Sequence, residues 1–144
     1  NGFASMGFAV PAAVSAKLLF PEKRVLAAVG DGGFLMSLCE LNTAVRLGTN
    51  FVCLVFNDGG YGLIEWKEKL RFNKDFFVKF ANPDFKKLAE SFGARGYRVT
   101  SDDELLPILE DAFAQPVPSV IDCPVDYSEN LILSEKLGRL ICPT

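Results

Sequence analysis

The chain has 144 residues, of which 49% are hydrophobic and 23% are charged, so it is large and apolar enough to bury one core as a single domain. Its formal net charge of −3 and the lack of a basic stripe interleaved with aromatic residues exclude the usual nucleic-acid footprint. No apolar run reaches the roughly 18 residues of a membrane span and no basic leader is visible, so we expect a cytoplasmic protein without a membrane role.

The residue types present restrict the chemistry further. The chain contains no histidine, which removes Ser-His, Cys-His and most zinc chemistries from within it. The cysteines are far apart and form no C-x-x-C motif, so we expect reduced thiols instead of disulfides or metal ligands. They are Cys39, Cys53, Cys123 and Cys142.

Helical and strand patterns alternate along the chain. We expect helices at 11–19, 34–47 (ended by Gly48), 84–92 (capped by Asp84 and ended by Gly93) and 101–114 (opened by a capping box at 101–104), and strands at 25–29, 51–56, 95–99 and 119–123. This alternation predicts an α/β fold with a mostly parallel sheet and helices on both faces. Segment 66–83 is the least regular stretch, and we interpret it as a mobile cover over the site.

Two acidic, glycine-rich loops follow the first two predicted strands. The motif GDGG occupies residues 30–33, and NDGG occupies residues 57–60. A right-handed βαβ crossover places both loops at the carboxyl edge of the sheet, where ligands bind in open α/β folds. Asp31 and Asp58 offer hard oxygen ligands, and the glycines allow close backbone approach. The pattern therefore predicts Mg²⁺ holding a phosphate group.

The GDG motif followed by Asn57-Asp58 resembles the signature of thiamine-diphosphate enzymes. The resemblance implies the thiamine-diphosphate-binding fold and, within it, the diphosphate-binding domain. It also implies that Asp31, Asp58 and the backbone carbonyl of Gly60 hold Mg²⁺, which holds the cofactor's diphosphate. Many family members have Asn at the Asp58 position, so Asp keeps an oxygen ligand and adds one negative charge.

Other segments resemble one branch of this family. Residues 2–13 are similar to the segment of acetolactate synthases beneath the aminopyrimidine ring, which implies roles for the carbonyl of Ala4 and the N–H of Met6. Residues 89–94 and 124–130 resemble the catabolic, flavin-independent acetolactate synthases. The implied cofactor-binding residues are Ala4, Met6, Gly30, Asp31, Gly32, Gly33, Asp58, Gly60, Tyr61, Gly62, Leu63 and Ile64. For Met6, Tyr61, Leu63 and Ile64, simple core packing is the alternative.

The resemblance implies that two molecules of pyruvate condense to 2-acetolactate and CO₂, with carbanion chemistry supplied by thiamine diphosphate. It implies no catalytic side chain within residues 1–144, because the activating glutamate belongs to the pyrimidine-binding domain of a neighbouring subunit. We therefore expect a homo-oligomer, either a dimer or a tetramer. We interpret the chain as an N-terminally incomplete diphosphate-binding domain, the C-terminal part of a longer chain, that is inactive in isolation.

Three alternatives remain open from the sequence. Another thiamine-diphosphate-dependent 2-oxoacid decarboxylase would share the metal motif, and a non-catalytic assembly module would share the fold. A nicotinamide-binding Rossmann domain is disfavoured, because Gly30 and Gly32 match its glycine pattern but Leu35 occupies the third position.

Overall fold

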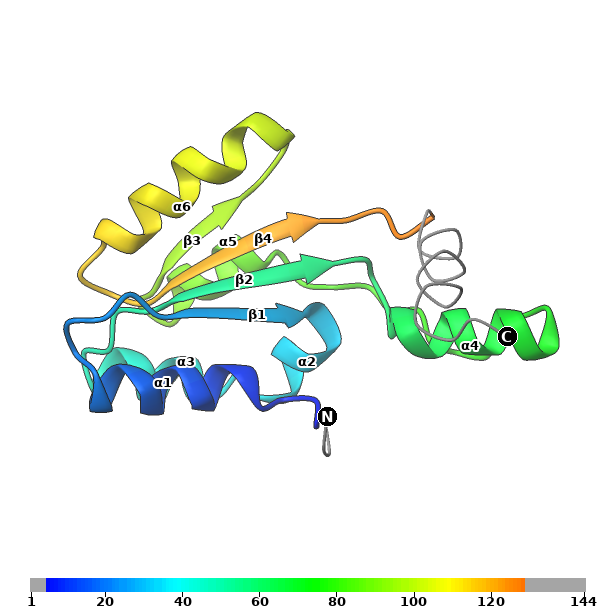
Figure 1. Ribbon diagram of the computed structural model, residues 1–144, viewed down its shortest axis with the longest axis horizontal. Coiled ribbons are helices and arrows are strands. Elements are labelled where there is room, and N and C mark those ends of the chain that lie inside the picture. Colours follow the sequence, from blue (N-terminus) through cyan, green and yellow to red (C-terminus); the bar gives the residue numbers. More distant parts are fainter. Residues whose placement is uncertain (1–4, 129–144) are drawn as a thin grey trace, which may run out of the picture.

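Four parallel strands form the centre of the fold, and the computed structural model describes residues 5–128. The strands are β1 (Leu26–Gly30), β2 (Val52–Asn57), β3 (Arg95–Arg98) and β4 (Ser119–Pro124). Their order in the sheet is β1-β2-β4-β3, and each neighbouring pair is parallel (Figure 1). Gly30 lies opposite Phe56, and Asn57 lies opposite Pro124. The first two strands and β4 therefore end at the same edge of the sheet.

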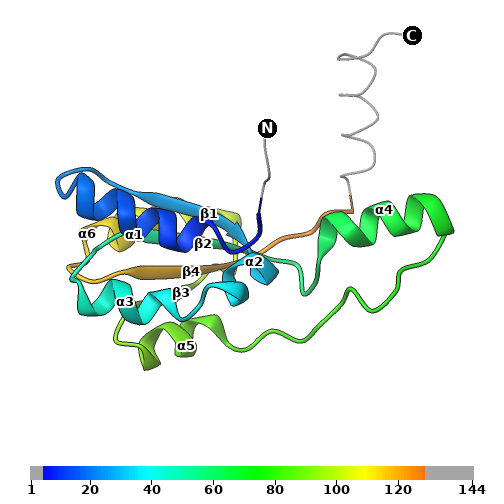
Figure 2. The same cartoon turned by 90° about the horizontal axis from the view of Figure 1, so that it is seen from below.

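Helices cover both faces of this sheet, which confirms the predicted α/β fold class. They are α1 (Ala9–Leu19), α2 (Asp31–Met36), α3 (Glu40–Arg46), α4 (Gly62–Phe72), α5 (Phe85–Ser91) and α6 (Leu105–Ala114), the last preceded by a 3-10 turn, η1 (Asp102–Glu104). α1, α3 and α5 lie on one face and α6 lies on the other (Figures 1 and 2). α4 extends beyond the carboxyl ends of the strands, and none of its residues is buried. Within residues 5–128, no helix is long and apolar enough to cross a membrane.

Two apolar layers, one on each side of the sheet, hold the helices in place. On the first face, the fully buried rings of Phe34 and Phe85 meet edge to face with their centroids 5.4 Å apart. Because successive strand residues point to opposite faces, β2 places Val55 in this layer and Leu54 in the second one. Ala112 of α6 packs in the second layer. The apolar run of β2 is thus explained by a strand that is buried on both sides.

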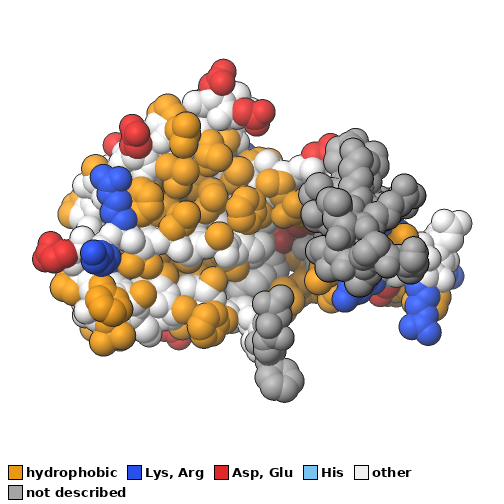
Figure 3. All heavy atoms as spheres, in the orientation of Figure 1, with side chains coloured by type: hydrophobic (Ala, Val, Ile, Leu, Met, Phe, Trp, Pro, Cys, Tyr) orange, Lys and Arg blue, Asp and Glu red, His pale blue; other side chains and the backbone are white. Residues whose placement is uncertain are grey.

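The second face of the sheet is covered only in part. α6 packs with β2 and β4, whereas Leu26 and Ala28 of β1 are exposed on the same face. Leu26 keeps 48% of its surface accessible. Figure 3 shows hydrophobic side chains across this face. The edge strand β1 therefore offers an apolar surface beside the functional edge of the sheet.

The predicted single helix over 34–47 is wrong. The chain instead forms α2, which begins at Asp31, and α3, which begins at Glu40. α2 leaves the carboxyl end of β1, whereas α3 lies along the face of the sheet, so the chain must turn between them (Figure 2). The N–H of Ser37 donates to the carbonyl of Phe34 at 3.1 Å and closes α2 at this turn. Gly48, with φ of +64°, follows α3 as predicted.

The boundaries of α5 agree with the sequence. Asp84 caps the helix, because its Oδ1 accepts a hydrogen bond of 3.1 Å from the N–H of Lys87. Gly93 has φ of +84°, a conformation that other residues rarely adopt, and it stops the helix two residues after Ser91.

The predicted capping box at 101–104 is wrong, because the side chain of Ser101 makes no capping hydrogen bond. A 3-10 turn precedes α6 instead, and the Glu104 carboxylate accepts hydrogen bonds of 2.8 Å from both the N–H and the hydroxyl of Thr100. Pro107 consequently falls in the first turn of α6, where its missing N–H removes no helical hydrogen bond. α6 ends at Ala114, as predicted.

The contact between α5 and β3 yields a test of the packing. A Cβ added to Gly96 would lie 2.2 Å from the carbonyl oxygen of Lys86, a backbone atom that can move only with α5. We expect Gly96→Ala to lower the free energy of unfolding by about 1–3 kcal/mol, measured by urea denaturation. Gly30→Ala is the matched control, since its Cβ would meet no atom within 4 Å. Equal stability of the two variants would contradict this packing.

Candidate functional site

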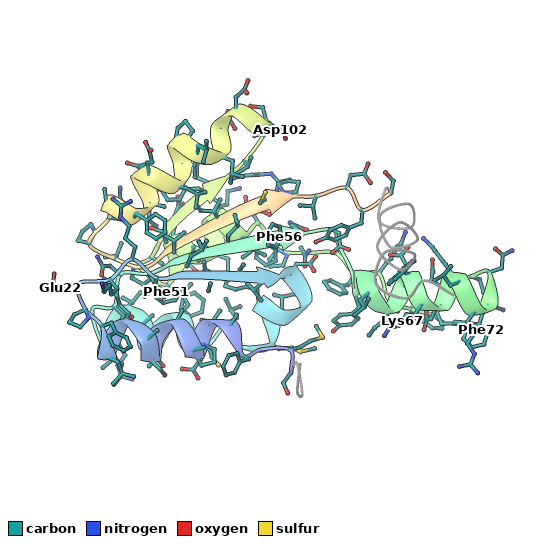
Figure 4. The ribbon with its side chains drawn as sticks, in the orientation of Figure 1. Glu22, Phe51, Phe56, Lys67, Phe72 and Asp102 are labelled. Atoms are coloured by element: carbon teal, nitrogen blue, oxygen red, sulfur yellow. The ribbon has the colours of Figure 1, made fainter. Side chains whose placement is uncertain are left out.

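A cavity of about 980 Å³ lies at the carboxyl ends of β1 and β2. Figure 4 labels Phe56 at the end of β2 and Lys67 in α4. The loop that connects β2 to α4 lines the cavity. All predicted cofactor residues within the described range line this cavity: Met6, Gly30, Asp31, Gly32, Gly33, Asp58, Gly60, Tyr61, Gly62, Leu63 and Ile64. Ala4 lies outside the described residues. Residues predicted from separate motifs thus meet in one place.

Asp31 is buried in the wall of the cavity, and both of its carboxylate oxygens accept hydrogen bonds. It is the first residue of α2, and only 1% of its surface is accessible. Its Oδ1 accepts the N–H of Gly32 at 2.7 Å. Its Oδ2 accepts the N–H of Gly59 at 2.8 Å and the side-chain amide of Asn82 at 2.6 Å. These donors allow a carboxylate to be buried at the edge of the core.

Asp58 lies across the cavity from the start of α2, in the loop that follows β2. A Cβ on Gly62 would lie 2.4 Å from its Oδ2, so glycine at the start of α4 leaves room for this carboxylate. Burial raises the pKa of the Asp58 carboxyl, and the nearby carboxylate of Asp31 raises that pKa further. The carboxylate of Glu65 acts in the same direction. Two negative groups therefore share a space in which a cation would relieve their repulsion.

Gly60 brings a backbone carbonyl to the same place. The segment around it forms a short antiparallel bridge, in which Tyr61 donates to the carbonyl of Val78 at 2.9 Å and Phe80 donates to the carbonyl of Gly59 at 3.0 Å. Within residues 5–128, no hydrogen bond is accepted by the carbonyl of Gly60. A Cβ on Gly60 would lie 2.8 Å from the Val78 carbonyl oxygen, so the bridge requires glycine here.

The donor set fits Mg²⁺ and a phosphate. Two carboxylates and a free carbonyl are the hard oxygen ligands that Mg²⁺ prefers. In the part of the chain that the structure describes, no group of three or more His, Cys, Asp or Glu side chains could hold a metal, so a metal here would need the carbonyl and the ligand itself to complete its coordination. Gly30 lines the cavity, and a Cβ added to it would meet nothing within 4 Å. A phosphate can therefore approach the backbone at this point.

Comparison with known proteins identifies the family. Residues 1–123 match the family model described as "Thiamine pyrophosphate enzyme, C-terminal TPP binding domain". The chain belongs to this family. It is 44% identical to the acetolactate synthase of Bacillus subtilis (strain 168) over 140 residues, which cover 96% of this chain and 25% of that protein. It is 41% identical to the catabolic acetolactate synthase of Raoultella terrigena over 137 residues, which cover 95% of this chain and 24% of that protein. The predicted resemblance is confirmed.

Other members of the family have different activities. The chain is 35% identical over 131 residues to the 3D-(3,5/4)-trihydroxycyclohexane-1,2-dione hydrolase of Bacillus velezensis, covering 86% of this chain and 21% of that protein. Among solved structures, the thiamine diphosphate-dependent 4-hydroxybenzoylformate decarboxylase of Rhodococcus jostii RHA1 superposes with a TM-score of 0.77 and 29% identity, covering 85% of this chain and 24% of that protein. This domain of the thiamine pyrophosphate enzymes spans about a quarter of the length of the curated relatives it matches.

The side chains around the acidic groups are apolar and open to the cavity. Leu63 and Ile64 are 61% and 45% exposed, and Met6 is 48% exposed, so the alternative that they are core residues is wrong. Tyr61 is half-buried, and its ring packs against Phe80 with the centroids 5.0 Å apart. These residues give the thiamine pyrophosphate domain an apolar wall next to its acidic end.

Some lining residues were not predicted from the sequence. They are Ala28, Val29 and Tyr127, whereas Ser5, Gly7, Phe8 and Ala9 belong to residues 2–13, the segment whose resemblance predicts a place beneath the aminopyrimidine ring. Trp66 also lines the cavity. Tyr127 follows β4, and the pKa of its phenol is raised by burial first and then by the carboxylates of Asp58 and Asp31. The one sequence signal that could have placed Tyr127 at the cavity is its position just after a strand that ends at this edge of the sheet. The indole Nε1 of Trp66 is buried without a hydrogen-bond partner in the described residues.

The predicted cover over 66–83 is corrected in part. Residues 66–72 belong to α4, whose last turn leads to Asn73 with φ of +55°. The rest of the segment reaches back to the cavity through the bridge at Lys79 and the side chain of Asn82. It therefore contributes hydrogen bonds to residues that line the site, among them Asp31 and Tyr61.

The repulsion between Asp31 and Asp58 predicts a dependence of stability on pH in the absence of metal. Because the folded-state pKa of Asp58 is raised above its ordinary 3.8, the ionised carboxylate destabilises the folded protein above that pKa. This penalty shrinks as the pH falls through the raised pKa and is gone below 3.8, where the carboxyl is mostly protonated in both states. With EDTA present, Asp58→Asn should therefore melt at a higher temperature than the wild type near neutral pH, and the difference should shrink on acidification.

Thermal melting between about pH 4 and about pH 8 checks this expectation. A difference in melting temperature that stays constant over this range, or a less stable Asp58→Asn variant at neutral pH, would contradict it.

Proposed function

We propose that this chain supplies the diphosphate- and Mg²⁺-binding domain of an acetolactate synthase that converts two molecules of pyruvate to 2-acetolactate and CO₂. The observation that carries the proposal is the convergence of the carboxylates of Asp31 and Asp58 and the free carbonyl of Gly60 on one cavity. Identities of 44% and 41% to acetolactate synthases favour this activity over others in the family. Since the chain spans about a quarter of those proteins, the reaction is proposed for the intact protein.

Each part of the cavity would have a distinct task. Asp31, Asp58 and Gly60 would hold Mg²⁺, and the backbone at Gly30 would receive the diphosphate. Thiamine diphosphate, when bound, supplies the carbanion chemistry of the reaction. The apolar side chains of Leu63 and Ile64 would exclude water from the reacting end.

The protein's contribution within this chain is therefore binding and orientation. The carboxylate of Asp31 is fixed by its hydrogen bonds before any ligand arrives, so no reorganisation is needed on binding.

We further propose that this domain works in a homo-oligomer, either a dimer or a tetramer, against the pyrimidine-binding domain of a neighbouring subunit. Phe8 and Met6 line the cavity and are 70% and 48% exposed. Exposed apolar groups at the rim of a ligand site are typical of a surface that another domain covers.

A decarboxylase is the second candidate, supported by the likeness to the 4-hydroxybenzoylformate decarboxylase. Such an enzyme would share the Mg²⁺ ligands and differ in the groups that receive the second substrate. A non-catalytic assembly module would keep the fold and lack the activating glutamate in its other domain.

The metal assignment is tested by titrating Mg²⁺ and thiamine diphosphate into variants of the intact protein. Asp31→Ala should abolish Mg²⁺-dependent cofactor binding, because it removes a buried carboxylate ligand. Asp58→Asn should be milder, since Asn keeps an oxygen ligand and lowers the repulsion. We expect the two variants to differ by about tenfold or more in cofactor affinity, which is about 1.4 kcal/mol. Small and equal losses would contradict the assignment.

The reaction is tested by product analysis. The intact protein, given pyruvate, Mg²⁺ and thiamine diphosphate without added flavin, should release 2-acetolactate, while the same protein without Mg²⁺ is the control. Acetaldehyde as the main product would favour the decarboxylase, and no turnover with bound cofactor would favour the assembly module.

A further inference from the structure

A continuous line of polar side chains runs along the carboxyl edge of the sheet and ends at Asp31. Arg98 donates to Oδ2 of Asp122, and Oδ1 of Asp122 accepts the side-chain amide of Asn57 at 2.8 Å. The amide of Asn82 donates to Oδ1 of Asn57 at 2.9 Å and to Oδ2 of Asp31 at 2.6 Å. Asn57 directly follows Phe56, which Figure 4 labels at the end of β2. The line therefore crosses the ends of all four strands.

The carboxylates of Asp122 and Asp31 fix the orientation of the two side-chain amides between them, those of Asn57 and Asn82. The carboxylate of Asp122 is 1% exposed and requires a donor, so the NH₂ group of Asn57 faces it and the Asn57 oxygen faces away. That oxygen and the carboxylate of Asp31 both require donors from Asn82. The NH₂ group of Asn82 has two hydrogens and satisfies both acceptors.

This arrangement leaves one polar atom of Asn82 without a hydrogen bond, which is energetically unfavourable. Its Oδ1 is buried and has no hydrogen-bond partner among the described residues. Reversing the amide would turn this oxygen towards a carboxylate and a carbonyl oxygen, which is worse than leaving it unpaired. The side chain is thus held in its orientation by the two acceptors, although one of its own polar atoms loses solvation.

We infer that Asn82 is a positioning residue for the Asp31 carboxylate, which it fixes in the orientation that binds Mg²⁺. The inference rests on the proposed function, in which Asp31 is a Mg²⁺ ligand. Asn82 is the one side chain among the described residues that donates to Asp31, and it occupies Oδ2 together with the N–H of Gly59. Oδ1 accepts a single hydrogen bond, from the N–H of Gly32, and keeps a lone pair for a cation.

Hydrogen bonds that orient metal ligands typically change metal affinity by about 10–100-fold when they are removed. The connection between α4 and α5 would then serve the metal site directly, although Asn82 does not line the cavity.

The test compares two asparagines in the intact protein. Asn82→Leu removes both donors and keeps the branched arrangement of the heavy atoms in a larger side chain, and Asn82→Ala repeats the loss if the larger side chain prevents folding. Asn50→Ala is the matched control, because the Asn50 amide also donates one long-range hydrogen bond, 3.3 Å to the carbonyl of Gln115, and lies outside the cavity. The readouts are the Mg²⁺ dissociation constant in the presence of thiamine diphosphate, the metal-free melting temperature, and kcat at saturating Mg²⁺.

We expect the Asn82 variants to raise the Mg²⁺ dissociation constant by about tenfold or more, with kcat largely restored at saturating Mg²⁺. Asn50→Ala should lower the melting temperature and leave the Mg²⁺ dissociation constant unchanged. Wild-type Mg²⁺ affinity in the Asn82 variants, or an equal loss in Asn50→Ala, would overturn the inference. Asp31→Ala in the same titration separates the two proposals, because unchanged Mg²⁺ affinity in that variant would instead remove Asp31 from the metal site.

Discussion

The structure depends on keeping one carboxylate, that of Asp31, buried at the edge of the hydrophobic core. An ionised group with 1% exposure is tolerated only if its oxygens are hydrogen-bonded. The donors come from the start of α2, from the loop after β2 and from the connection between α4 and α5. Segments that are distant in sequence are therefore held together by a single acceptor, and the cavity takes its shape from their convergence.

The second carboxylate would add affinity for the proposed cation at a cost in stability. Asp58 lies near Asp31, and its raised pKa records both its burial and this repulsion. The glycines at positions 60 and 62 allow the loop to hold Asp58 close to Asp31. A Cβ at position 60 would collide with Val78, and a Cβ at position 62 would collide with Asp58 itself. Unfavourable local arrangements of this kind are concentrated at functional sites.

The sequence predicted the sheet, the edge and most of the cavity, because these follow from local patterns. Apolar runs of strand length, each ended by an acidic glycine loop, place Asp31 and Asp58 together as soon as the strands are parallel. The break between α2 and α3 was missed because the helical periodicity continues through Ser37, while the change of direction is imposed by the sheet. The predicted capping box does not form, because the Glu104 carboxylate accepts its hydrogen bonds from the N–H and the hydroxyl of Thr100.

Asn82 was missed for a similar reason, since its partners lie 51 and 25 residues away in the sequence and nothing in its neighbourhood marks it. Tyr127 reaches the cavity only because β4 pairs with β2, a register that is a tertiary property. Local patterns thus placed the proposed metal ligands, whereas the residues that would orient and enclose them depend on contacts that form only in the folded chain.

The most direct test of the central claim is anomalous X-ray diffraction from crystals of the intact protein grown with thiamine diphosphate and Mn²⁺ in place of Mg²⁺. The account predicts one strong anomalous peak bounded by a carboxylate oxygen of Asp31, a carboxylate oxygen of Asp58 and the carbonyl oxygen of Gly60. The ion should also contact the diphosphate beside Gly30. A cofactor-bound crystal with the manganese peak elsewhere, or with these three oxygens directed away from it, would contradict the account.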